Sequence, residues 1–154
     1  MEGKTVAQTR ITMARSMQPP DANGYGNVHG GVIMRFVDEA AGAVAIRHSH
    51  MRCVTASLDH MSFDNPAFIG DLVTAVAFMT YVGRSSMEIE CQVTAESMVT
   101  GEARPISTCF LVYVATDENG KPTPVPPLIL ETDEERQLWL EAEKRRKLRT
   151  HSTR

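Results

Sequence analysis

The residues that could do chemistry gather where a glycine-rich loop runs into a long apolar segment, between residues 26 and 45. Gly30 and Gly31 let the backbone approach a ligand closely, and the residues after them contain no proline for about four turns. A helix is therefore expected to begin directly after the loop. Its free N–H groups and the positive end of its dipole would lie beside Asn27 and His29, where they suit an oxygen atom that gains negative charge.

Asp38 is out of place on this helix, because Ala41 and Gly42 lie about one turn away from it. A carboxylate among such neighbours lies either in a low-dielectric setting or at the rim of a cleft, where it would act on a ligand. The alternative is an ordinary ion pair on the helix surface, since Arg35 lies three residues before Asp38 and four before Glu39. Glu39 faces about 100° away from Asp38 and is interpreted as a structural or ion-pair residue.

The cysteines and one histidine pair are the other groups able to bind a metal or react. Cys53, Cys91 and Cys109 are odd in number and lie singly in apolar runs, so they are interpreted as reduced core residues. His48 and His50 are close in sequence, but no third ligand follows at convincing spacing, and a solvated helix end is the better interpretation. No metal site is predicted.

The bulk composition limits the class of protein. The 154 residues fit one domain with a substantial core, and the net charge of −3 gives no reason to expect nucleic acid or an anionic membrane as a partner. The N-terminus has no apolar core of signal-peptide length, and no segment approaches a membrane span. A cytoplasmic location is therefore expected.

Alternating apolar and polar residues predict an antiparallel sheet around the helix. The expected strands, in chain order, are 5–17, 53–59, 72–82, 87–95 and 106–115. The helix is apolar on too many sides for one flat face, so the economical packing is one sheet wrapped around it, in the α+β class. Such a sheet leaves an edge strand and an open side. Pairing with a second copy would cover both, so at least a homodimer is expected.

The C-terminal part of the chain predicts a second helix. Four prolines between residues 122 and 127 force an extended segment, and residues 132–135 form a capping box that opens the helix. Its basic end, residues 144–149, is interpreted as a solvated helix end. The alternative is a docking surface for nucleotide phosphates or for another subunit.

A series of motifs in this order resembles the acyl-CoA thioesterases of the hotdog fold. The motifs are Asn27-Val28-His29-Gly30-Gly31, Asp38-Glu39-Ala40, Phe63 with Pro66, Ile69-Gly70-Asp71, residues 81–88, Tyr113-Val114-Ala115 and Pro124-Val125-Pro126. The resemblance runs from about residue 12 to residue 127. It implies a thioesterase domain over residues 1–130, with 131–154 as a helical tail outside the matched region.

The resemblance implies a fold and a mechanism. The sheet of a hotdog thioesterase curls around one central helix, dimers place two active sites at their interface, and trimers of dimers, which are hexamers, are frequent. The amide of Gly31 would bond the thioester carbonyl oxygen, and Asn27 would orient the carbonyl or the water. Asp38 of the partner subunit would act as general base or as nucleophile. The products would be a free fatty acid and CoA, with no cofactor besides the CoA of the substrate.

Further residues are expected to contact the acyl-CoA substrate. They are His29, Gly30, Thr55, Ser57, Arg84, Ser85 and Ser86, of which Arg84 would lie near the CoA portion. Each has a structural alternative: His29 as loop packing, the serines of the turn as turn formers, and Arg84 as a solvated arginine. Two other functions share the fold. They are a hotdog hydratase or dehydratase, and a non-catalytic acyl-CoA-binding sensor.

Overall fold

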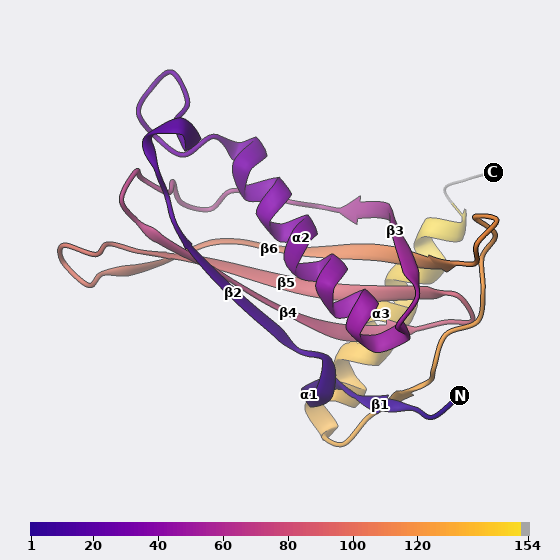
Figure 1. The fold of residues 1–154 in the computed structure, drawn as a ribbon. Helices are drawn as coiled ribbons and strands as arrows, with labels where there is room; N and C mark the ends of the chain where they lie inside the picture. Colours follow the sequence, from indigo (N-terminus) through magenta and orange to yellow (C-terminus); the bar gives the residue numbers. More distant parts are fainter. Residues whose placement is uncertain (152–154) are drawn as a thin grey trace.

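The computed structural model describes residues 1–151, which form a five-stranded antiparallel sheet on one side of a long helix (Figure 1). The strand order is β2-β4-β5-β6-β3, so β2 and β3 are the two edges. The strands of this sheet are β2 (Ile11–Ser16), β3 (Arg52–Asp59), β4 (Leu72–Val82), β5 (Ser86–Glu96) and β6 (Ala103–Thr116). Short β1 (Lys4–Thr5) and β7 (Leu128–Ile129) pair in parallel beside it. The predicted sheet wrapped around a central helix is confirmed.

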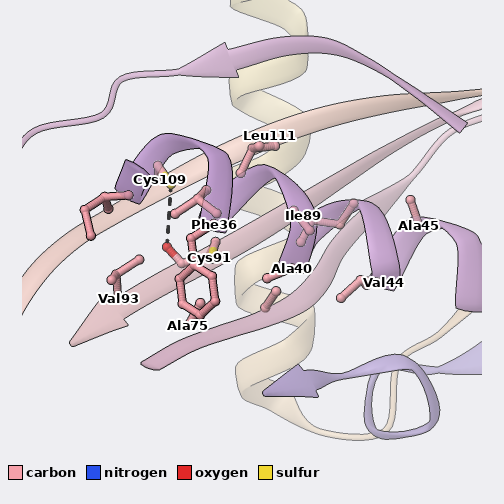
Figure 2. Packing of buried hydrophobic residues seen from close by; sticks show 14 of the residues in the cluster. Phe36, Ala40, Val44, Ala45, Ala75, Ile89, Cys91, Val93, Cys109 and Leu111 are labelled. Carbon is pink, nitrogen blue, oxygen red and sulfur yellow. Dashed lines mark hydrogen bonds between the residues drawn. The ribbon is translucent and has the colours of Figure 1, made fainter. Parts of the chain in front are cut away.

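The central helix α2 (Gly30–Ser49) packs on the inner face of the sheet through small residues. Ala40, Ala41 and Val44 are completely buried and share one hydrophobic cluster with residues of β4, β5 and β6. Figure 2 shows this layer, with Ala40 and Val44 of α2 facing Ile89 of β5. Small side chains allow the helix backbone to lie close to the strands, which explains the alanine-rich second half of α2.

The first expected strand is correct only in its second half. Residues Val6–Thr9 form the short helix α1, and β2 begins at Ile11. The reason is a capping box: the Thr5 hydroxyl accepts from the Gln8 N–H at 3.3 Å, and the Gln8 side chain accepts from the Thr5 N–H at 2.8 Å. After β2, the 3-10 helix η1 (Pro19–Asp21) leads into the loop before α2.

The second predicted helix, α3 (Asp133–His151), covers the outer face of the sheet, opposite α2 (Figure 1). Ala142 is completely buried, and the Trp139 ring lies 5.0 Å from the Tyr81 ring of β4. Arg145 and Arg149 turn inward and bind a buried carboxylate of β5. The interpretation of the basic end as a solvated helix end is therefore wrong for these two arginines.

The cysteines are all free, and two of them lie in the core. Burial raises the pKa of the Cys91 thiol to about 12 and that of the Cys109 thiol to about 11. Thiols of such high pKa are poor nucleophiles. Because both are free and buried, the interpretation as reduced core residues is confirmed for this pair, whereas Cys53 is free but only half-buried. Among residues 1–151, no group of three or more histidine, cysteine or acidic side chains is placed to hold a metal ion, and no helix is long and apolar enough to cross a membrane.

His48 is completely buried, although the sequence suggested a solvated helix end. Its Nε2 lies 2.8 Å from the backbone oxygen of Pro126, whereas Nδ1 finds no hydrogen-bond partner among the described residues. His50, by contrast, is exposed and ends the helix in the left-handed conformation, with φ of 55°. Desolvation by burial lowers the pKa of His48 below its ordinary value, and the nearby Lys4 adds to this effect.

The free energy of unfolding should therefore fall in mild acid through His48. Below about pH 6.5 the unfolded chain protonates this histidine, while the folded chain keeps it neutral, so unfolding is favoured as the pH falls. Urea unfolding at several pH values should show wild type losing stability relative to His48→Gln below about pH 6.5. The glutamine cannot titrate. Parallel stability curves for the two proteins would contradict this role of His48.

Candidate active site

The N-terminus of α2 carries a polar cap made by His29. The backbone of His29 is extended, and its Nδ1 accepts a hydrogen bond from the Gly31 N–H at 2.9 Å. The Gly30 N–H finds no acceptor within residues 1–151. Of the two glycine amides at this helix end, that of Gly31 therefore already has a side-chain acceptor and that of Gly30 is open to a ligand.

The loop before α2 is held by one asparagine that the sequence interpretation did not single out. The Asn23 side-chain oxygen accepts from the backbone N–H groups of Tyr25 at 2.9 Å and Asn27 at 3.1 Å. The backbone N–H of Asn23 donates to the backbone oxygen of Asn27 at 2.7 Å. Gly26 between them has φ of 82°, a conformation that glycine adopts without strain. These contacts fix both asparagines beside the helix N-terminus.

A cavity of about 350 Å³ lies at this end of α2. Its polar lining includes Asn23 and Asn27, and its apolar lining includes Ile33, Phe63 and Ile106. Gly30 also lines the cavity, and a Cβ at this position would stand 3.4 Å from the Phe63 ring. Asn65 and Asp64 complete the polar part of the lining. A cavity with an apolar wall, side-chain amides and a free helix N–H can hold an acyl group and polarise its carbonyl.

Asp38 lies farther along α2 and is exposed in the single chain. Two hydroxyl groups donate to its Oδ1: that of Thr55 at 2.8 Å and that of Tyr113 at 2.6 Å. Arg35 pairs with Glu39 at 2.9 Å. The ion pair considered for Arg35 from the sequence is thus formed by Glu39, whose interpretation as an ion-pair residue is confirmed, and Asp38 is left to the two hydroxyls.

The cavity and Asp38 are too far apart to act on one substrate atom within a single chain. Gly31 and Asp38 are separated by seven residues on one helix, which corresponds to about 10.5 Å along the axis. A general base must come within about 3 Å of the proton it removes. One chain therefore supplies two half-sites, one at the helix N-terminus and one at Asp38.

The structure places the remaining expected substrate residues in two regions. Ser57 follows Thr55 on β3 after a β-bulge and makes no hydrogen bond to Asp38. Arg84 and Ser85 lie in the β4–β5 turn at the far end of the sheet, and Ser86 begins β5 and pairs with Val114 of β6. The cavity meets β6 eight residues earlier, which is about 26 Å away along an extended strand. Within one chain, the turn is remote from the cavity.

The antiparallel sheet packed around one long central helix defines a hotdog-fold protein. Residues 25–102 match the family model of the thioesterase superfamily. The chain belongs to this family. It is 37% identical, over 87% of its length and 78% of the relative, to an uncharacterised acyl-CoA thioester hydrolase of Bacillus subtilis. It is 36% identical over 94% of its length to a cytosolic acyl coenzyme A thioester hydrolase of Rattus norvegicus, but spans only 38% of that protein.

Solved structures with a similar fold include acyl-CoA thioesterases and acyl-CoA hydrolases. A hexameric acyl-CoA thioesterase in its apo form is 35% identical and superposes with a TM-score of 0.93, covering 99% of this chain and 98% of the other. An acyl-CoA hydrolase of Staphylococcus aureus bound to butyryl coenzyme A is 30% identical, with a TM-score of 0.83 over 97% of this chain and 95% of the other. Variants of that hydrolase replace an asparagine, an aspartate fifteen residues later, and a threonine seventeen residues after the aspartate.

Proposed function

We propose that this protein hydrolyses acyl-CoA thioesters to free fatty acid and CoA. The observation that carries the proposal is the Asp38 carboxylate, fixed by two hydroxyls, on the same helix whose N-terminus opens on a cavity with apolar and amide walls. The names of the Bacillus subtilis and Rattus norvegicus relatives support it. The reaction needs no cofactor besides the CoA of the substrate. The catalytic unit would correspond to residues 1–130, with a helical tail from residue 131 onward, of which 152–154 lie outside the described residues.

The thioester carbonyl oxygen would bind at the N-terminus of α2. The Gly31 amide is the donor expected from the sequence, but its N–H bonds His29 Nδ1. The substrate oxygen therefore either takes the place of the His29 imidazole on Gly31 or accepts from the free N–H of Gly30. Loss of one oxyanion donor typically costs about 3–4 kcal/mol of transition-state stabilisation, so either amide would contribute strongly.

Asp38 of the partner subunit would act on this carbonyl. As a general base it removes a proton from water while the water oxygen bonds to the carbonyl carbon. The C–S bond then breaks, and the CoA thiolate leaves and takes up a proton. As a nucleophile, a carboxylate oxygen attacks the carbonyl carbon, the C–S bond breaks to release the CoA thiolate, and water then hydrolyses the resulting anhydride. The separation of about 10.5 Å between the two half-sites of one chain supports the contribution from a partner.

Two asparagines are candidates for orienting the carbonyl or the water. Asn27 is the one expected from the sequence, and it lines the cavity together with Asn23. Asn23 lies fifteen residues before Asp38, and Thr55 lies seventeen residues after it. These are the spacings of the three residues replaced in the Staphylococcus aureus hydrolase. We therefore assign the orienting role to Asn23 first, with Asn27 as the second amide of the cavity.

The remaining substrate contacts follow from assembly. Gly30 lines the cavity, and His29 caps the helix end beside it. Thr55 bonds Asp38, with Ser57 two residues further along β3. The turn of residues 84–86 would meet the CoA portion of a substrate held across two subunits. The protein would form at least a homodimer, and the hexameric neighbour supports a trimer of dimers. A cytosolic relative supports a cytoplasmic location. Neither nucleic acid nor a membrane is a proposed partner.

Thiol release from a panel of acyl-CoAs of short to long chain length tests the proposed function. We expect release of free CoA from at least one member, including a short chain such as butyryl-CoA. The same panel in its enoyl-CoA forms, followed by absorbance of the double bond, tests for a hydratase. Binding of acyl-CoA without thiol release or hydration would replace the enzyme by a non-catalytic sensor.

A further inference from the structure

We propose that Tyr113 is a positioning residue for the Asp38 carboxylate, an inference that rests on the proposed hydrolysis. Tyr113 lies on β6 directly opposite Thr55 of the edge strand β3. The two hydroxyls of this cross-strand pair converge on one atom, Asp38 Oδ1, at 2.6 Å from Tyr113 and 2.8 Å from Thr55. Asp38 Oδ2 has no hydrogen-bond partner within residues 1–151. The pair therefore holds one carboxylate oxygen and leaves the other available to react.

Tyr113 is the rigid member of this pair. Its side chain is 3% exposed, whereas Thr55 lies exposed on the sheet edge. The ring lies against α2 at Gly42, where an added Cβ would stand 3.6 Å from both the ring and the hydroxyl. A buried ring in close contact with the helix has little freedom, so the carboxylate of Asp38 is oriented by a fixed donor.

The hydroxyl of Tyr113 does not need the carboxylate in order to be satisfied. It also lies 2.8 Å from the backbone oxygen of Asp38, and this acceptor alone would meet the requirement of a buried hydroxyl. Burial and the bond to Asp38 raise the pKa of Tyr113 above its ordinary value, so the phenol keeps the proton that it donates to the carboxylate. The hydrogen bond from Tyr113 to Oδ1 therefore orients the carboxylate, and it holds the exposed side chain of Asp38 in one conformation.

The variant Tyr113→Phe removes the hydroxyl and keeps the ring. We expect kcat for thiol release to fall about tenfold to a hundredfold, the range for one hydrogen bond to a charged group, with KM changed less than about twofold. A buried aromatic ring that only fills space would not separate kcat from KM in this way. The matched control is Tyr81→Phe, which removes a buried tyrosine hydroxyl from β4 on the opposite face, where it lies 3.4 Å from Arg146. That control should keep wild-type kcat.

Thr55→Val and the double variant complete the test. Since both hydroxyls bind one oxygen, the double variant should have a lower kcat than either single variant, with unchanged circular dichroism and oligomeric state. A Tyr113→Phe enzyme with wild-type kcat, or with only KM raised, would overturn the positioning role and leave the hydrolysis proposal intact. A wild-type protein that hydrolyses no acyl-CoA would overturn both.

Discussion

Asp38→Asn is expected to lower kcat/KM for acyl-CoA hydrolysis by a factor of about 10²–10⁴, the usual contribution of a positioned general base. Asparagine keeps the size of the side chain and an oxygen that accepts from Thr55 and Tyr113, so the local structure is preserved. Only the negative charge is lost, and with it the ability to remove a proton or attack a carbonyl. Thiol release, with size-exclusion chromatography as a control for assembly, measures the effect. Activity close to wild type would remove Asp38 from the mechanism.

The same variant tests whether the two half-sites meet across subunits. Asp38→Asn lacks the carboxylate, and Asn23→Ala lacks one amide of the cavity, so each homodimer is expected to be nearly inactive. When the two are unfolded together and reassembled, half of the dimers are mixed, and each mixed dimer has one intact site if the sites are shared. Activity should then return to about one quarter of wild type. If both half-sites served one chain, the mixture would stay inactive.

The central helix, the glycine pair at its start and Asp38 could be picked out from the sequence because each depends on a local pattern. Adjacent Gly30 and Gly31 mark the start of α2, which the structure places at Gly30. Asp38 stood out because its neighbours are small and apolar. The contact that matters most for Asp38 was not predictable. The strand containing Tyr113 is a continuous apolar run, and such a run does not reveal which side chain faces the helix or which residue of β3 it pairs with.

In the loop before α2, the sequence did not show which asparagine organises the backbone. Asn23 and Asn27 lie in one turn-rich segment, and residue type alone does not rank them. The structure separates them by hydrogen bonding, since the Asn23 side chain accepts the N–H of Asn27 and thereby organises the loop. The His29 cap on Gly31 was also unforeseen, because histidine is not among the usual N-cap residues.

The basic end of α3 was misinterpreted because a charge run looks the same whether it faces water or a buried acid. Glu88 on β5 alternates with apolar residues, a pattern typical of a strand with one solvated face. Its side chain is 1% exposed, because α3 covers that face and brings Arg145 and Arg149 to it. The pairing of a tail helix with a strand about sixty residues earlier leaves no periodic signal in the sequence.

This buried charge cluster is expected to dominate the attachment of α3. Glu88 accepts from the Thr80 hydroxyl at 2.9 Å, from Arg145 Nη2 at 2.8 Å and from Arg149 Nη1 at 3.0 Å. Arg149 also binds Asp59 at the end of β3, so one guanidinium links the tail helix to both a central and an edge strand. Removal of the shared carboxylate would leave Arg145 with a partly buried, uncompensated charge, while Arg149 would keep its ion pair with Asp59.

Glu88→Ala should therefore lower the free energy of unfolding by about 3 kcal/mol, the lower end of the range for breaking a buried ion pair. The lower end applies because the two guanidiniums are 24% and 25% exposed and regain some hydration. Urea unfolding at one fixed protein concentration measures the loss, since assembly adds to stability. Asp133→Asn is the control, because its pair with Arg136 lies on the surface of α3 and contributes little. Equal stability of the two variants would mean that desolvation cancels the attraction within the cluster, and that α3 is held by its apolar contacts at Trp139 and Ala142.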